Sequence, residues 1–304
     1  MPAVRARLPG GRWHFQHGPI DLVIGAEGRP GALDAAHEAA WARFSTLLDE
    51  LVAELPLLRQ PVQNGPCPLR GAVARRMWFA CAPFAAGFIT PMAAVAGSVA
   101  QEVVAFYRRD GVERAWVNNG GDIALHLAPG ATVRVGLFAD LARFDPTQPL
   151  RTDALTVLGA DMPVRGIATS GWRGRSFSLG IADSATVLAA SAAEADAAAT
   201  VIGNAVTVDD QRIRRRPASS LKDDSDLGAI AVTVEVPPLP PELVRLAIES
   251  GLRRARELQA AGLIHGAAIA CQGRFAALPF AQAATTATMH AMPRPAALTA
   301  EGCR

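Results

Sequence analysis

The chain has few cysteines, no excess of charge of one sign and no repeat of fixed period. Its 304 residues include only four cysteines, Cys67, Cys81, Cys271 and Cys303, and no two of them form a Cys-x-x-Cys pair. This scatter argues against a zinc site, an iron–sulfur cluster and a disulfide framework, and it suits a reducing cytoplasm. The net charge is +2 and no basic stripe alternates with aromatic residues, so we do not expect nucleic acid as a partner.

An export signal and a membrane anchor are also not expected. Residues 1–15 mix three arginines with proline and glycine and lack a continuous apolar core. Residues 77–100 contain no charged side chain over a length that could cross a membrane, but Pro83, Pro91 and many small residues favour a buried element. We expect a cytoplasmic homodimer, because this apolar stretch exceeds what one chain is expected to cover.

Half of the residues are hydrophobic, which is enough for a large core. The length fits one large domain or two tightly packed ones. A tail rich in Ala, Thr and Pro over residues 281–304 is predicted to be disordered. Residues 211–228 are predicted to be a charged, exposed connection. Helical periodicity predicts helices at 32–55, 91–109, 191–200 and 241–261. Extended or alternating runs predict strands at 12–17, 21–25, 115–118, 122–125, 132–138, 150–158, 230–236 and 265–271.

The stretch 166–175 is the first candidate site. It holds three glycines, Thr169, Ser170, Arg173 and Arg175, so as a loop it could offer N–H groups, hydroxyls and positive charge to a phosphate or another anion. The alternative interpretation is an ordinary turn.

An alanine-rich helix that follows supplies the second candidate site. Asp196 and Thr200 are four residues apart, so their oxygens share one helix face and could bind a hard cation such as Mg²⁺. Alternatively, Thr200 bonds to the carbonyl four residues before it and Asp196 is a solvated surface acid.

A third candidate is the stretch Asn119-Gly120-Gly121-Asp122 between two apolar runs. It predicts a tight hairpin. It also fits a turn on which a flat ligand lies against the glycines while Asn119 and Asp122 bond its polar edge.

Three ordered motifs resemble the ApbE superfamily, the FAD:protein FMN transferases. They are residues 119–123, residues 168–171, and Ala195-Asp196 with Thr200. The resemblance implies a single α+β domain over residues 1–280, in which mixed or antiparallel sheets pack with helices. It implies Gly120, Gly121, Asp122, Thr169, Ser170 and Gly171 for FAD and Asp196 and Thr200 for Mg²⁺. A backbone carbonyl of residues 94–96 would complete the cation site.

The chain also departs from the family pattern. Ala96-Gly97 stands where the transferases have Lys-Gly, and a histidine-containing segment before the metal helix is absent. These features resemble a shorter, largely uncharacterised ApbE-like branch, some of whose archaeal members are linked to sulfur assimilation toward homocysteine.

Three functional hypotheses follow. The first is a Mg²⁺-assisted transferase that binds FAD or a related nucleotide or phosphorylated ligand, with FMN transfer as one outcome and Arg173 or Arg175 stabilising the leaving phosphate. The second is a non-flavinylating biosynthetic or ligand-binding component that handles sulfur on Cys67 or Cys271. The third is an interaction scaffold that has lost the site. No catalytic residue is assigned.

Overall fold

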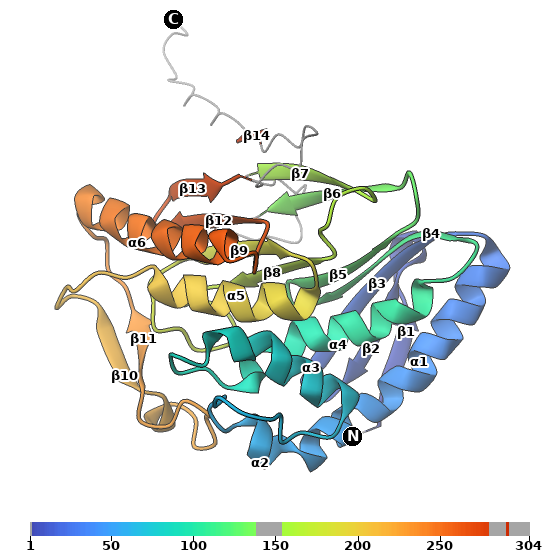
Figure 1. The fold of residues 1–304 in the computed structure, drawn as a ribbon, viewed down its shortest axis with the longest axis horizontal. Helices are drawn as coiled ribbons and strands as arrows, with labels where there is room; N and C mark the ends of the chain where they lie inside the picture. Colours follow the sequence, from blue (N-terminus) through green and yellow to red (C-terminus); the bar gives the residue numbers. More distant parts are fainter. Residues whose placement is uncertain (1, 138–153, 280–289, 292–304) are drawn as a thin grey trace, which may run out of the picture.

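A nine-stranded sheet is the framework of the protein. The computed structural model describes residues 2–137, 154–279 and 290–291. The strand order is β1-β2-β3-β4-β5-β8-β9-β12-β13, and all eight neighbouring pairs are antiparallel (Figure 1). The bounds of these strands are Val4–Arg7, Trp13–His17, Ile20–Gly28, Val112–Asn119, Asp122–Leu127, Gly166–Ser170, Ser184–Ala189, Gly266–Cys271 and Arg274–Leu278.

The principal helices cover one face of this sheet (Figure 1). α1 packs on β3, α4 on β4 and β5, α5 on β8 and β9, and α6 on β12 and β13. The α-helices are α1 (Pro30–Ala53), α2 (Leu55–Leu58), α3 (Ala72–Cys81), α4 (Val95–Val104), α5 (Ala192–Ala205) and α6 (Pro241–Ala260). The α+β class with antiparallel sheets packed against helices is therefore confirmed.

The opposite face of the sheet carries a smaller hydrophobic cluster. It joins Leu125 of β5, Ile167 of β8 and Leu188 of β9 to Val135 and Leu158. The last two belong to a three-stranded sheet of β14, β7 and β6, with bounds His290–Ala291, Ala154–Gly159 and Thr132–Leu137. A separate antiparallel pair, β10 (Arg214–Pro217) and β11 (Ala231–Glu235), lies beside α5 and α6.

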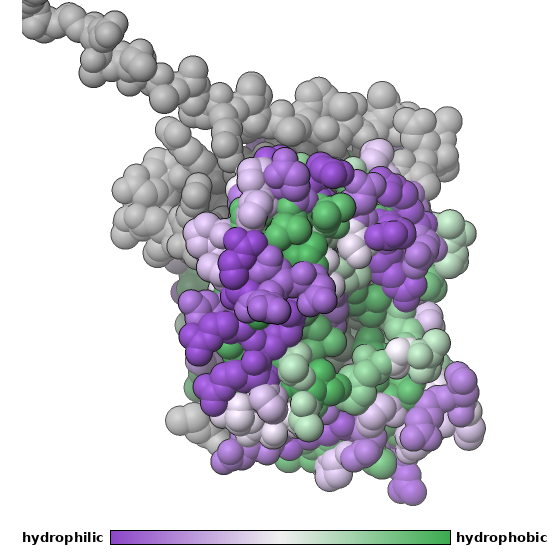
Figure 2. Space-filling model, turned by 90° about the vertical axis from the view of Figure 1, so that its left-hand side faces the viewer, coloured by the Kyte–Doolittle hydropathy of each residue, from purple (hydrophilic) through white to green (hydrophobic). Residues whose placement is uncertain are grey.

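Figure 2 shows the side of the molecule at which α6, β10 and β11 lie in Figure 1. Hydrophobic residues are exposed in the middle of this side, with hydrophilic residues around them. The amphipathic helix α6 lies on this side: its buried residues include Val244, Ile248 and Leu258, and its outer face carries ion pairs such as Arg245–Glu249.

Local sequence accounts for where the central helix begins. Ser191 caps α5: its hydroxyl oxygen accepts the Glu194 backbone N–H and donates to the Glu194 carboxylate at 2.9 Å. The alanines of α5 are buried between β8, β9, α4 and α6 because their small side chains allow close approach.

Gly97 sets the approach of α4 to α5. A Cβ atom at this position would lie 2.2 Å from the Ala192 carbonyl oxygen and 2.9 Å from the Asp196 Cβ. Only a hydrogen atom fits there, so the first turn of α4 can contact the first turns of α5 directly.

Most of the predicted elements are present, with several corrections. Residues 166–170 form strand β8 instead of a loop, because they pair with β5 and β9 inside the sheet. The predicted connection 211–228 contains β10, and β1 and β13 were not predicted. Residues 140–149 lie outside the described residues. The tail predicted at 281–304 also lies outside them, except for His290 and Ala291 in β14.

The uncharged stretch 77–100 is not one helix. It contains the end of α3, two 3₁₀ turns and the start of α4. Within this stretch, the exposed large hydrophobic side chains are Phe79 and Phe88. Among the described residues, none of the helices combines the length and apolar character that a membrane crossing requires. The expectation of a homodimer therefore depends on two exposed phenylalanines, and it stays a prediction.

We predict that Gly97→Ala lowers the free energy of unfolding by about 1 to 3 kcal/mol, because the new methyl group would overlap the Ala192 carbonyl. Gly31→Ala, in the first turn of α1, is the matched control, since its Cβ atom would have no neighbour within 4 Å. Urea unfolding of both variants measures the difference. Equal midpoints would contradict the close α4–α5 contact.

Candidate functional site

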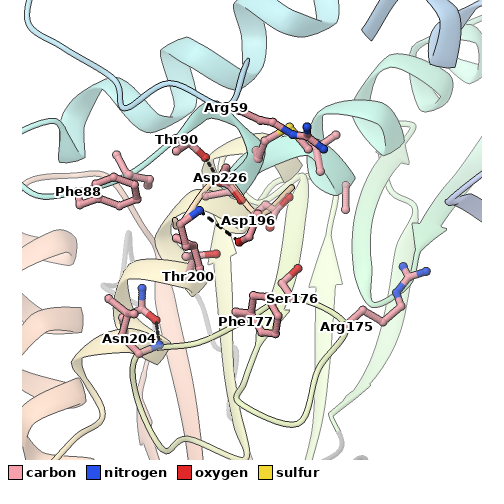
Figure 3. Close-up of a pocket in the computed structure, with 18 of the residues that line it drawn as sticks. Arg59, Phe88, Thr90, Arg175, Ser176, Phe177, Asp196, Thr200, Asn204 and Asp226 are labelled. Carbon is pink, nitrogen blue, oxygen red and sulfur yellow. Dashed lines mark hydrogen bonds between the residues drawn. The ribbon is translucent and has the colours of Figure 1, made fainter. Parts of the chain in front are cut away.

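Helix α5 presents a stripe of polar side chains to a cavity. Asp196, Thr200 and Asn204 are spaced four residues apart, so they lie on one face of the helix, and all three line the cavity. Figure 3 shows these three side chains together with Thr90 and Asp226, which lie close to Asp196. Ser176 and Phe177 lie near Thr200 and Asn204 in the same view. Asn204 was not predicted, although the same spacing of four would have pointed to it.

The Asp196 carboxylate is held by the start of α4. Its Oδ2 accepts the Gly97 backbone N–H at 2.9 Å, and the Ala96 N–H also bonds to this side chain. Both N–H groups belong to the first turn of α4, which has no partner for them within the helix. Burial raises the pKa of Asp196 well above its ordinary value, and the nearby Asp122 charge acts in the same direction.

Asp122 is the second carboxylate in the cavity. It opens β5 directly after the Gly120-Gly121 turn, and its Oδ1 accepts the Thr169 backbone N–H at 3.1 Å. Burial raises the pKa of Asp122 from 3.8 to about 7, although the Thr169 N–H and the Arg175 charge oppose the rise. Two carboxylates from different elements therefore line the same cavity, close enough for the charge of Asp122 to raise the pKa of Asp196.

The turn before Asp122 supports Arg175. Gly120 and Gly121 have φ values of +67° and +115°, as two-residue hairpin loops require. A Cβ atom on Gly120 would lie 1.8 Å from a guanidinium nitrogen of Arg175, so Gly120 leaves the space that Arg175 occupies. The Asn119 amide donates to the Ala96 carbonyl at 3.1 Å, which ties the turn to the start of α4.

The cavity has a volume of about 300 Å³ and carries cationic side chains at its margin. Arg59, Arg175 and Lys222 line it together with the acids named above. Arg59 pairs with Asp224 at 2.6 Å, and the Thr90 hydroxyl donates to Asp226. These two contacts hold residues 222–227 over the cavity, so part of the predicted exposed connection belongs to its wall.

The comparisons with known proteins identify the family. A family model described as "AbpE bacteria" matches residues 5–277. A UPF0280 protein of Methanothrix thermoacetophila is 35% identical over 219 residues, which cover 64% of this chain and 80% of that protein. A UPF0280 protein of Methanopyrus kandleri is 34% identical over 240 residues, which cover 74% of this chain and 90% of that protein. The chain belongs to the AbpE bacteria family.

Solved structures named ApbE are similar to this chain. The flavin transferase ApbE from Vibrio cholerae has a TM-score of 0.48 at 12% identity and covers 92% of this chain and 98% of its own. An ApbE protein from Thermotoga maritima has a TM-score of 0.44 at 13% identity and covers 90% and 96%. The resemblance inferred from the three motifs is thus confirmed at the level of the family.

In this AbpE family chain, only some of the predicted site residues reach the cavity. Asp122, Arg175, Asp196 and Thr200 line it. Seven others do not line it: Asn119, Gly120, Gly121, Thr169, Ser170, Gly171 and Arg173. Gly120 leaves space for Arg175 and Asn119 bonds to Ala96, so both residues support the cavity without lining it. Their direct contact with a ligand stays a prediction.

The strand that replaces the predicted anion loop explains part of this placement. The Thr169 hydroxyl bonds to Thr186 of β9 at 2.9 Å, and its N–H bonds to Asp122. Arg173 lies over the Trp172 ring and 3.9 Å from the Asp183 carboxylate. The residues of the motif thus hold Asp122 and the sheet in place. Arg175 lines the cavity, and Figure 3 shows its guanidinium directed away from Asp196 and Thr200, on the side of the Gly120 turn.

We predict that Asp122→Asn stabilises the protein at high pH in the absence of divalent cations. Because the folded state holds the Asp122 proton more tightly than the unfolded chain, the wild type loses stability as pH rises from about 4 to about 7. Asparagine keeps an acceptor for the Thr169 N–H but has no charge to bury. We expect a gain of about 1 to 3 kcal/mol at about pH 8 and little difference near pH 4.

Thermal unfolding in EDTA across this range measures the effect. Asp110→Asn, at an exposed carboxylate, is the control. A constant difference between wild type and Asp122→Asn at every pH would contradict the shift.

Proposed function

We propose that the protein is a Mg²⁺-dependent enzyme that binds FAD or a related nucleotide in this cavity and transfers or cleaves at its phosphate. The observation that carries the proposal is the convergence of Asp122, Asp196 and Thr200, from β5 and α5, on a cavity that three cationic side chains also line. The resemblance of the three motifs to FAD:protein FMN transferases favours FAD as the nucleotide and FMN transfer as the activity.

The oxygen atoms at this place fit a hard cation. Mg²⁺ binds through one or two carboxylates and keeps water, so Asp196, Thr200 and a backbone carbonyl of residues 94–96 form a suitable donor set. Within the described residues, the Thr200 hydroxyl has no hydrogen-bond partner, and no cluster of three or more His, Cys, Asp or Glu offers another metal site. A divalent cation here would also offset the repulsion between Asp122 and Asp196.

The basic side chains have a matching role. Arg59, Arg175 and Lys222 would bind the phosphate oxygens of the ligand, and Arg175, which lines the cavity whereas Arg173 does not, would stabilise a leaving phosphate. When bound, Mg²⁺ supplies charge neutralisation at the phosphate. The protein itself contributes orientation, through groups that the sheet and α5 hold rigidly.

The structure favours this proposal over sulfur handling on cysteine. Cys271 is buried in β12, and burial raises the pKa of its thiol to about 12. Neither Cys67 nor Cys271 lines the cavity. A carrier cysteine needs an accessible thiolate, which Cys271 does not provide.

We predict that FAD binding requires Mg²⁺ and that Asp196→Asn and Thr200→Val each weaken it by about ten-fold or more. Asparagine can still accept the Gly97 N–H, so the contact between α4 and α5 survives while the charge is removed. Isothermal titration with FAD and with ADP, each in MgCl₂ and in EDTA, measures this, with Asp110→Asn as the control. The proposal would be wrong if neither ligand binds, or if binding is unchanged in EDTA.

A second prediction concerns the anion-binding side chains. Asp224 pairs with Arg59 and lies 3.8 Å from Lys222, so an incoming phosphate must compete with its carboxylate. Asp224→Asn should tighten Mg²⁺–ADP binding by about two- to five-fold at low salt, and Arg59→Gln should weaken it. Asp223→Asn, a neighbouring exposed acid that does not line the cavity, is the matched control. Equal effects of the two asparagine variants would contradict a specific role of Asp224.

A further inference from the structure

Asn204 occupies the third position of the stripe on α5, one turn beyond Thr200. It is half-buried and lines the cavity, close to the point where α5 ends at Ala205. The cation site and the phosphate groups discussed above do not involve it. Its side chain therefore requires its own explanation.

The orientation of the Asn204 amide is fixed by the neighbouring chain. Its Oδ1 accepts the Leu179 backbone N–H at 2.9 Å and the Ser178 hydroxyl at 3.2 Å. A backbone N–H can only donate, so the atom that it meets must be the oxygen of the amide and not the nitrogen. The Nδ2 group consequently points away from Leu179, as Figure 3 shows.

The Nδ2 group is a donor without an acceptor from the protein. Within the described part of the chain, no hydrogen bond involves this atom. Because the residue lines the cavity, its free N–H groups are available to a ligand. A rigidly held amide donor of this kind discriminates between ligand groups that accept a hydrogen bond and groups that do not.

The cavity also has an apolar and aromatic lining. Phe88, Met92, Phe177 and Leu179 contribute to it, and 44% of the Phe88 surface is exposed. Leu179 is also the residue that fixes Asn204. An exposed aromatic side chain at a cavity suits a planar ring, which stacks on it and excludes water.

We propose that Asn204 is a specificity residue whose Nδ2 donates a hydrogen bond to a carbonyl oxygen or ring nitrogen of a planar heterocycle that packs on Phe88 and Phe177. The heterocycle is the ring of the nucleotide ligand, so this inference deepens the proposed function and rests on it for the ligand class. The contact itself involves neither the cation nor phosphate.

The test uses riboflavin and adenosine, which carry the two heterocycles of FAD without any phosphate and so need no Mg²⁺. Asn204→Asp keeps an acceptor for the Leu179 N–H and the Ser178 hydroxyl but replaces the donor with an oxygen. We expect wild type to bind at least one of the two probes, and Asn204→Asp to bind it about ten-fold more weakly or worse. Riboflavin fluorescence and calorimetry with adenosine give the dissociation constants.

Two control variants separate this role from general effects of charge or folding. Gln211→Glu makes the same change from amide to carboxylate at an exposed residue that does not line the cavity, so it should change binding by less than about two-fold. Phe88→Ala removes the exposed ring without disturbing the core, and it should weaken the same probe by about five-fold or more.

Three results would overturn the inference: neither probe binds wild type, Asn204→Asp binds as wild type does, or Gln211→Glu loses as much affinity as Asn204→Asp. These results are separate from those that test the proposed function. Mg²⁺-independent FAD binding would defeat the metal-dependent enzyme and leave the Asn204 contact standing. If FAD binding depends on Mg²⁺ but Asn204→Asp binds the probes as wild type does, the metal-dependent enzyme would stand and the Asn204 contact would be wrong.

Discussion

The hydrogen bond from the Gly97 N–H to the Asp196 carboxylate joins the fold to the candidate site. A carboxylate buried without a partner is costly, and the first turn of α4 offers N–H groups that have no partner of their own. The contact satisfies both groups at once, but only because position 97 lacks a side chain. The same side chain that holds α4 against α5 therefore also faces the cavity.

The other parts of the site are connected to this contact. Asn119 bonds to Ala96, next to Gly97, and so places the Gly120-Gly121 turn beside the start of α4. This turn positions Asp122, whose carboxylate accepts the Thr169 N–H of β8. Three motifs that are far apart in the sequence are thus linked by hydrogen bonds around the start of α4. This linkage explains why they occur together.

The sequence was most informative where a pattern is local. The spacing of Asp196 and Thr200 on a helix and the Asn-Gly-Gly-Asp hairpin are each set by neighbouring residues, and the structure has both. The anion loop was predicted wrongly because small residues such as Thr169 and Ser170 are typical of turns, while their pairing with β9 depends on distant chain.

Contacts between distant segments had no local signal. Residues 222–227 are rich in charge and were expected to be solvated. In the structure, Asp224 pairs with Arg59, 165 residues earlier in the chain, and Asp226 accepts a hydrogen bond from Thr90, 136 residues earlier. Nothing in either segment alone indicates the other. Asn204 differs, because its spacing from Thr200 is local and could have been noticed.

Charges of both signs line the cavity: Asp122 and Asp196 are held by the sheet and α5, and Asp224 and Asp226 lie on the same segment as Lys222. Arg59 and Arg175 line it as well. A free phosphate would meet the carboxylates, and a free cation would meet the basic side chains. A ligand that carries both signs, such as a cation bound to a phosphate, would satisfy both groups together. Under the proposed function, such a ligand would bind better than either ion alone, without a separate recognition element for each.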